Sequence, residues 1–235
     1  MLKVSAPGKC ILLGEHAVVY GHPALAISID MRLNVKISKQ NIPSDSHIID
    51  GNPLKDLQHP HIVQALNEIW DPQLEMLDIS VFSEIPPSAG LGSSAALSVA
   101  ISTGLKVIRN GRDFDLKEIS SIAHKLEANA QDGLASPMDT ATSTHGGCIL
   151  LANEKLGDNW LYSRKLGEKK WEIHSFKLPK NMEEASLVIG HTGIHAPTVE
   201  MVKGVKQRLE DRPELIQDMN AISALTNLGV RAIEN

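Results

Sequence analysis

The chain has 235 residues and a net charge of −5, and its hydrophobic and charged fractions are 42% and 22%. These fractions are typical of a globular protein with a substantial core, and they exclude a disordered chain. With only 3% aromatic residues and no surplus of basic residues, the composition argues against a nucleic-acid binder.

The cysteines and the apolar segments indicate the cellular compartment in which the protein is expected. Cys10 and Cys148 are the only cysteines and lack Cys-x-x-Cys spacing, which argues against a disulfide framework and against a thiolate metal site. The first residues contain no long apolar stretch, and no run approaches the ~18 apolar residues of a membrane span. We therefore expect a soluble, cytoplasmic protein with no membrane or nucleic-acid partner.

Short strands and one helix are expected in the N-terminal third. Residues 24–29 and 33–37 are predicted as two strands, and residues 77–82 as a third, whose alternation suits a strand with one buried face. Between them, residues 61–70 are predicted as a helix with its apolar side chains on one face.

The rest of the chain is predicted to be mainly helical. In chain order we expect a buried helix over 95–108, a helix over 116–130 with Asp115 as its N-cap and Glu118 in a capping box, hairpins or a long excursion over 153–181, a helix with Val202, Val205 and Leu209 on one face, and a last helix from Leu215 to the chain end.

A glycine-rich stretch between a predicted strand and a predicted helix is the strongest local feature. It consists of Pro86, Pro87, Ser88, Ala89, Gly90, Leu91, Gly92, Ser93, Ser94, Ala95 and Ala96. Glycines let the backbone approach an anion, and the first turn of a helix offers N–H groups and a favourable dipole. Ser93 and Ser94 add hydroxyls for phosphate oxygens or Mg²⁺. The stretch is therefore predicted to bind phosphate, with an ordinary serine-capped glycine turn as the less favoured alternative.

Two known phosphate-binding patterns fit this stretch less well. The Walker A pattern needs Lys-Ser/Thr after its last glycine, which the chain lacks. Gly90-x-Gly92-x-x-Ala95 satisfies the dinucleotide fingerprint, with Asp113 and Asp115 about 20 residues on. However, Asp115 opens a predicted helix instead of ending a strand. A dinucleotide-binding oxidoreductase therefore remains a second interpretation.

Two other segments place charged side chains beside turns. Lys9 precedes an apolar run, and the pair Glu15–His16 follows Gly14; Glu127 ends a predicted helix, and Asp139 follows a Ser-Pro turn. Because Glu127 and Asp139 lie on different elements, they suit two different roles. One carboxylate could bind a metal ion and the other could accept a proton. Taken singly, Lys9 also fits a solvated lysine and Asp139 a helix N-cap.

Together these segments resemble the GHMP kinase superfamily, and within it the archaeal-type mevalonate kinases. The similar segments are residues 7–9 with 14–21 for the first family motif, 86–96 for the ATP-binding motif, 135–139 with Gly146 and Gly147 for the archaeal catalytic segment, and 190–193 for the substrate-side threonine segment. The resemblance covers the chain except for a divergent stretch around residues 153–181.

The resemblance implies an α/β (α+β) GHMP kinase fold in two domains. Residues 1–184 would form an ATP-binding domain like domain 2 of ribosomal protein S5, and residues 185–235 the start of an incomplete ferredoxin-like domain. The third glycine-rich motif of the family is absent, which indicates a truncated chain. The path from Glu127 to Asp139 is also one residue longer than usual, with Asp132 as the extra residue.

The resemblance further implies transfer of the ATP γ-phosphoryl group to the C5 hydroxyl of mevalonate, with Mg²⁺ as cofactor. It assigns Asp139 and Lys9 to catalysis, residues 86–96 to the ATP phosphates, Ser94 and Glu127 to the metal, and Glu15, His16 and Thr192 to mevalonate. It is compatible with a homodimer. The alternatives are another GHMP kinase, such as a phosphomevalonate kinase or a mevalonate 3-kinase, and a fragment that binds nucleotide without turnover.

Overall fold

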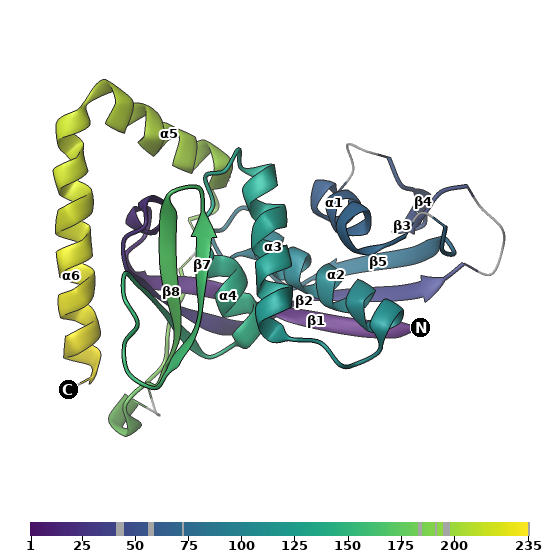
Figure 1. Cartoon of the computed structure of the whole chain (residues 1–235), viewed down its shortest axis with the longest axis horizontal. Coiled ribbons are helices and arrows are strands. Elements are labelled where there is room, and N and C mark those ends of the chain that lie inside the picture. Colours follow the sequence, from purple (N-terminus) through teal and green to yellow (C-terminus); the bar gives the residue numbers. More distant parts are fainter. Residues whose placement is uncertain are drawn as a thin grey trace.

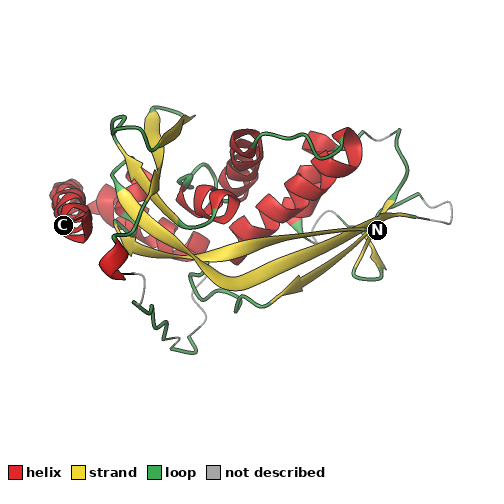
Figure 2. Cartoon of the chain, turned by 90° about the horizontal axis from the view of Figure 1, so that it is seen from below, coloured by secondary structure: helices red, strands yellow, loops and turns green. Residues whose placement is uncertain are grey.

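A computed structural model of the chain describes residues 1–40, 45–55, 59–71, 73–182, 185–190, 192–194 and 198–234. They form one twisted sheet with helices packed on it (Figures 1 and 2). The strands are β1 (Leu2–Leu13), β2 (Ala24–Lys39), β3 (Ile48–Ile49), β4 (Asn52–Pro53), β5 (Leu77–Ser83), β6 (Cys148–Ala152), β7 (Trp160–Leu166) and β8 (Lys169–Phe176).

The strand order is β4-β3-β5-β2-β6-β8-β7, with β1 also paired to β2. Every pair of strands is antiparallel except β3 with β5, which is parallel. A dinucleotide-binding domain needs parallel strands around its glycine loop. Here β5, the strand before the loop, lies antiparallel to β2, so the dinucleotide-binding interpretation is wrong.

β2 is one continuous strand, so the prediction of two strands over 24–29 and 33–37 is wrong. The intervening residues carry no Gly or Pro to break the strand, and β1 pairs with both halves of β2. Pro7 lies at an irregularity in this pairing, where its missing N–H does no harm. At mid-strand, Arg32 is held on both sides: its Nε donates to Ser5 Oγ at 3.0 Å and its backbone N–H to Glu84 Oε2 at 3.1 Å.

The predicted helices are confirmed, with shifted ends. The helices are η1 (Ala17–Tyr20), α1 (Pro60–Ile69), α2 (Ser93–Asn110), α3 (Leu116–Ala130), α4 (Met138–His145), η2 (Lys180–Met182), α5 (Thr198–Asp211), η3 (Pro213–Leu215) and α6 (Ile216–Glu234). Asp115 caps α3 by accepting a hydrogen bond from the backbone N–H of Lys117. The polar stretch over 153–181 contains the antiparallel hairpin β7–β8.

Side-chain alternation along β2 places two helices on opposite faces of the sheet. Ala24 and Ala26 belong to a buried cluster with Met138 of α4, whereas Leu25 belongs to another with Val230 of α6. A third and larger cluster joins the other half of β2 to α1, α2 and α3. The strands thus hold α4 in the middle of the molecule, beside the glycine-rich loop that precedes α2.

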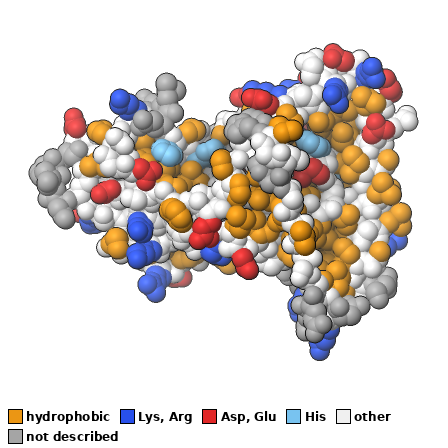
Figure 3. Space-filling view, turned by 180° about the vertical axis from the view of Figure 1, so that it is seen from behind, with side chains coloured by type: hydrophobic (Ala, Val, Ile, Leu, Met, Phe, Trp, Pro, Cys, Tyr) orange, Lys and Arg blue, Asp and Glu red, His pale blue; other side chains and the backbone are white. Residues whose placement is uncertain are grey.

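The C-terminal part of the chain exposes large apolar side chains. Val188, Leu225 and Leu228 are 90%, 65% and 60% exposed, and Figure 3 shows hydrophobic side chains gathered on the half of one face that carries this part. Such surface favours association. The domain boundary near residue 185 stays a prediction. Among the described residues, no helix combines the length and apolar character needed to cross a bilayer.

Candidate active site

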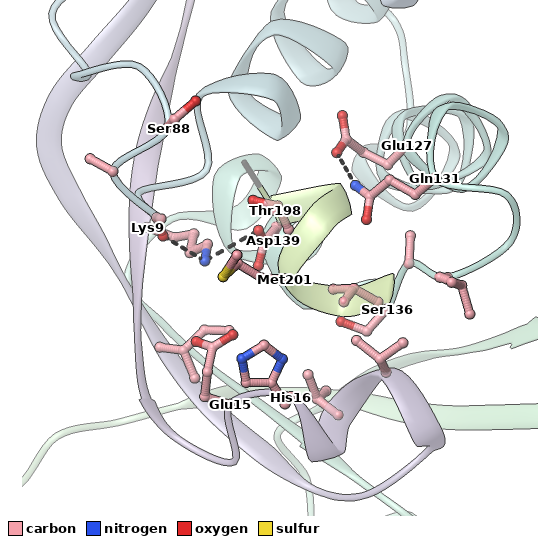
Figure 4. A pocket seen from close by; sticks show the side chains of 18 of the residues that line it. Lys9, Glu15, His16, Ser88, Glu127, Gln131, Ser136, Asp139, Thr198 and Met201 are labelled. Carbon is pink, nitrogen blue, oxygen red and sulfur yellow. Dashed lines mark hydrogen bonds and ion pairs between the residues drawn. The ribbon is translucent and has the colours of Figure 1, made fainter. Parts of the chain in front are cut away.

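A cavity of about 330 Å³ opens between β1, η1, the glycine-rich loop, the α3–α4 turn and the start of α5 (Figure 4). The residues predicted from the sequence that line it are Lys9, Glu15, His16, Ser88, Ala89, Gly90, Glu127, Asp139 and Thr192. The other loop residues, 86–87 and 91–96, are not part of its lining. The tertiary structure therefore gathers all three sequence motifs around one cavity.

The glycine-rich loop has a backbone suited to an anion. Ser88, Gly90 and Gly92 have φ values of 53°, 74° and 74°, and such left-handed turns direct successive N–H groups into a concave surface. The loop ends at the first turn of α2, whose N-cap Gly92 makes no side-chain cap hydrogen bond. A Cβ on Gly92 would lie 2.9 Å from Cγ of Lys9, so glycine also leaves room for that side chain.

Lys9 joins β1 to the loop and to α4. Its backbone N–H donates to Leu91 O at 2.9 Å and its Nζ to Gly90 O at 2.9 Å. The same Nζ lies 3.2 Å from Oδ2 of Asp139. Lys9 is only 5% exposed, so the interpretation of a solvated lysine is wrong. Its pKa is lowered by burial, but the charges of Asp139 and Glu15 outweigh this and raise the pKa above its usual value.

Asp139 lies in the first turn of α4, where the helix dipole favours a carboxylate. Pro137 is the N-cap of α4. The alternative prediction that Asp139 is a helix N-cap is therefore wrong. Burial raises the pKa of Asp139 above its ordinary value, although the charge of Lys9 acts in the opposite direction. A carboxylate with a raised pKa is a stronger base, and Lys9 keeps it in the ionised form that can accept a proton.

Glu127, in the last turn of α3, receives donors on both carboxylate oxygens. Ser94 Oγ and Gln131 Nε2 each lie 3.0 Å from its Oε2. Ser98 Oγ lies 2.9 Å and His61 Nε2 3.0 Å from its Oε1. Burial raises the pKa of Glu127, but His61 and the two serines outweigh it and lower the pKa below the usual value. Glu127 is therefore an ionised carboxylate inside the protein.

Three members of this cluster were missed by the sequence analysis. Gln131 had a signal, because it follows Glu127 by four residues and so shares its helix face. His61 and Ser98 had none, because α1 and α2 meet Glu127 only in the tertiary structure. The cluster thus extends the predicted pair of Ser94 and Glu127.

The wall opposite the glycine-rich loop carries Glu15 and His16. These residues follow Gly14, whose φ is 88° and where a Cβ would lie 2.4 Å from Pro23 O, so only glycine permits this turn. Thr192, also predicted, lies exposed at the cavity edge, and its Oγ1 accepts from the N–H of Ile194 at 3.3 Å. The remaining lining is largely apolar, from Ile11, Val18, Val19, Leu134, Ile194, Met201 and Val202.

Asp132, the predicted extra residue, lies in the turn after α3. Its φ is 53°, and its Oδ2 contacts Nζ of Lys203 at 2.8 Å. Asp132 lies beyond the end of α3, and the hydrogen bond from Ser94 to Glu127 is present. That Asp132 is an additional residue stays a prediction.

Ser94 and Glu127 offer the hydroxyl and ionised carboxylate oxygens that Mg²⁺ takes as ligands. In this structure Ser94 Oγ donates a hydrogen bond to Glu127 Oε2 at 3.0 Å. No group of three or more His, Cys, Asp or Glu in the described part of the chain forms a metal site by itself. An ion there would need phosphate or water oxygens as further ligands.

Comparison with known proteins identifies the class to which this fold and loop belong. A family model described as the GHMP kinases N terminal domain matches residues 60–147. The chain is 34% identical over 240 residues to a mevalonate kinase of Methanothermobacter thermautotrophicus, covering 97% of this chain and 70% of that protein. It is 33% identical to a mevalonate kinase of Archaeoglobus fulgidus, covering 94% and 69%. The chain belongs to the mevalonate kinase family of the GHMP kinases, which are ATP-dependent kinases.

Solved structures agree with this fold. A crystal structure of mevalonate kinase from L. major in complex with R-mevalonate superposes with a TM-score of 0.65 at 22% identity, covering 100% of this chain and 69% of that one. The chain spans 63% to 70% of the length of five curated relatives described as mevalonate kinase.

Proposed function

We propose that the protein transfers the γ-phosphoryl group of ATP to the C5 hydroxyl of mevalonate and so forms 5-phosphomevalonate. The observation that carries the proposal is the contact between the buried Lys9 and the half-buried Asp139. This pair lies between a glycine-rich loop suited to phosphate and a wall that carries Glu15 and His16. Relatives named mevalonate kinase support the choice of substrate.

In this proposal the loop over residues 86–96 binds the ATP phosphates through its N–H groups and the N-terminus of α2. Ser94 and Glu127 hold Mg²⁺ through their hydroxyl and carboxylate oxygens. When bound, the ion would neutralise the charge of the β- and γ-phosphates. Gln131 and Ser98 keep the Glu127 carboxylate in one orientation.

The mevalonate would lie against the opposite wall of the cavity. Glu15, His16 and Thr192 are its polar partners, and His16 faces the carboxylate end of the substrate. The apolar side chains Val18, Val19 and Leu134 suit its aliphatic carbons. A cavity with one polar and one apolar side matches a small hydroxy acid with a methyl branch.

The chemical step would be driven by positioning and charge. Asp139 accepts the proton of the C5 hydroxyl as the oxygen of that hydroxyl bonds to the γ-phosphorus and the bond to ADP breaks. Lys9 keeps Asp139 ionised before the step and stabilises the negative charge that develops on the attacking oxygen. General-base assistance of this kind contributes about 10²–10⁴-fold to a rate.

A coupled ADP-release assay with ATP, Mg²⁺ and mevalonate tests the proposal, with galactose and phosphomevalonate as control substrates. We expect turnover with mevalonate alone. Turnover with phosphomevalonate and none with mevalonate would instead indicate another kinase of this superfamily. Tight Mg·ATP binding without turnover on any substrate would indicate the alternative of a nucleotide-binding fragment.

A further inference from the structure

His124 of α3 is a fully buried histidine for which the proposed mechanism has no role. Arg164, on β7, donates from its Nε to Nδ1 of His124 at 2.9 Å, and Nε2 of the same ring lies 3.2 Å from the carbonyl oxygen of Ala135. A guanidinium offers only donors, so Nδ1 must present its lone pair to Arg164. The proton of the neutral ring therefore resides on Nε2, which donates to Ala135 O.

The surroundings keep this ring neutral and in place. The pKa of His124 is lowered to about 4, mainly by burial, and the charge of Arg164 contributes to this shift. Nη2 of Arg164 donates to the carbonyl oxygen of Ser121 at 3.0 Å, so the guanidinium is itself anchored on α3. The indole of Trp171 meets the imidazole edge-on, with ring centroids 6.2 Å apart.

The carbonyl that His124 holds belongs to a wall of the cavity. Ala135 and Ser136 line it, and Pro137 then caps α4, whose first turn carries Asp139. Trp171 contacts another part of the lining, because its Nε1 donates at 2.9 Å to the carbonyl oxygen of Val18 in η1. The β7–β8 hairpin supplies both Arg164 and Trp171, so it supports the cavity at two places.

We propose that Arg164 and His124 are positioning residues: Arg164 fixes the Nε2–H tautomer of His124, which holds the Ala135 carbonyl and so sets the approach of Asp139 to Lys9. The kinetic consequence rests on the proposed function, whereas the tautomer and the placement of the wall do not. The pairing follows from the contacts of Arg164 and His124 in this chain.

The protein contains an internal control for the tautomer. His174 on β8 is also buried, at 2% exposure, and does not line the cavity. The backbone N–H of Leu156 donates to its Nε2 at 2.9 Å, and its Nδ1 lies 3.2 Å from Glu172 O. A donor at Nε2 forces the proton onto Nδ1, which is the opposite tautomer to that of His124.

Nitrogen-15 spectra of the imidazole rings of the resting protein at pH 7 test the tautomer without any substrate. We expect His124 to be protonated at Nε2 only and His174 at Nδ1 only. In Arg164→Met, Nδ1 of His124 loses its donor, so the Nδ1 resonance of His124 should shift while both ring resonances of His174 stay in place. A doubly protonated or Nδ1-protonated His124 in the unmodified protein would overturn the assignment.

Activity and backbone amide shifts test the positioning. Because a displacement of the order of 1 Å at a reacting group costs up to about 10²-fold, we expect kcat of His124→Leu to fall 10- to 100-fold with KM for ATP unchanged. His124→Gln, which retains a donor near Nε2, should recover most of that loss, and His174→Leu should keep kcat. Equal kcat for His124→Leu and His174→Leu would refute the positioning role.

Two further measurements test the positioning role if His124→Leu does not fold or if mevalonate is not the substrate. Arg164→Gln keeps a neutral N–H donor and should retain more activity than Arg164→Met; the reverse order would contradict the proposal. If the unmodified protein has no activity on mevalonate, the backbone amide resonances of Ser136 and Asp139 still test the positioning role of His124. They should move in His124→Leu and stay in place in His174→Leu, and the absence of that difference would overturn the positioning role independently.

Discussion

The ammonium group of Lys9 and the carboxylate of Asp139 lie 3.2 Å apart, one on the first strand and the other in the first turn of α4. The contact joins the glycine-rich loop to α4, because the same ammonium also donates to Gly90 O. Neighbouring charges of opposite sign support each other's ionised form. The pair therefore combines a positioned cation with a basic carboxylate at the centre of the cavity.

Asp139→Ala should keep its affinity for Mg·ATP and lose at least about 10²-fold in turnover, because a general base is removed while the phosphate loop is left intact. Calorimetric titration with nucleotide and the coupled assay measure the two quantities. Asp132→Ala is the control, since its ion pair with Lys203 is exposed and contributes little. Unchanged turnover in Asp139→Ala would contradict its assigned role.

Lys9→Met should move the acidic limb of the pH–rate profile to higher pH. Lys9 favours the ionised form of Asp139, so its removal raises the pKa of the carboxyl, and the base becomes protonated at a higher pH than before. Turnover measured across the acid range against the unmodified protein checks the sign. A limb that stays in place or moves to lower pH would show that Lys9 does not set the ionisation of Asp139.

Ser94→Ala and Ser98→Ala form a matched pair for the metal. Each removes one hydroxyl that donates to Glu127, Ser94 to Oε2 and Ser98 to Oε1. Since we propose that Ser94 contacts Mg²⁺ and that Ser98 only orients Glu127, Ser94→Ala should raise the Mg²⁺ concentration for half-maximal rate by about tenfold more than Ser98→Ala does. Identical Mg²⁺ dependence in the two variants would argue against Ser94 as a ligand.

Gly92→Ala should lower both stability and turnover. The left-handed backbone at φ 74° costs a residue with a Cβ about 1–2 kcal/mol, and the added carbon would meet the Lys9 side chain. Gly111→Ala is the control, because its φ is 83° and a Cβ there meets no described atom within 4 Å. Both variants should melt earlier, but only Gly92→Ala should lose activity. Full activity in Gly92→Ala would show that the loop tolerates a displaced Lys9.

Glu172 makes stability depend on pH. Burial raises the pKa of this carboxyl, but hydrogen bonds from Lys170, Ser163 and Trp160 outweigh it and lower the pKa to about 2. Because this value lies below the ordinary 4.5, the stabilisation is complete above pH 4.5 and disappears as the pH falls towards 2. We expect it to amount to about 2 kcal/mol, less than the full shift would give, since Lys170 is about half exposed and screened by solvent.

Urea unfolding of the unmodified protein and of Glu172→Gln between pH 2 and pH 7 measures this dependence. The difference in unfolding free energy between the two proteins should be largest near neutral pH and should shrink below pH 4.5. A difference that does not change with pH would mean that the hydrogen bonds stabilise the neutral and the ionised carboxyl equally.

The sequence by itself determined the local parts of this protein. Residues 86–96 could be predicted to bind phosphate because glycines, serines and a helix start fall within one short segment. The structure confirms the strand before this segment and the helix after it. The cap at Asp115 and the strand over 77–82 were likewise confirmed, since capping and alternation depend on near neighbours in the chain. The candidate residues Lys9 and Asp139 were found by motif, from residue types beside particular turns.

Only the tertiary structure decided what these parts do to one another. β2 runs unbroken because β1 pairs along both of its halves, an interaction that is absent from the local pattern. His61 reaches Glu127 because α1 packs near α3, and Arg164 reaches His124 because the β7–β8 hairpin lies against the same helix. Hydrogen bonds and ion pairs act over about 3 Å. Whether two groups interact therefore depends on the packing of distant elements, which is set by the hydrophobic core as a whole.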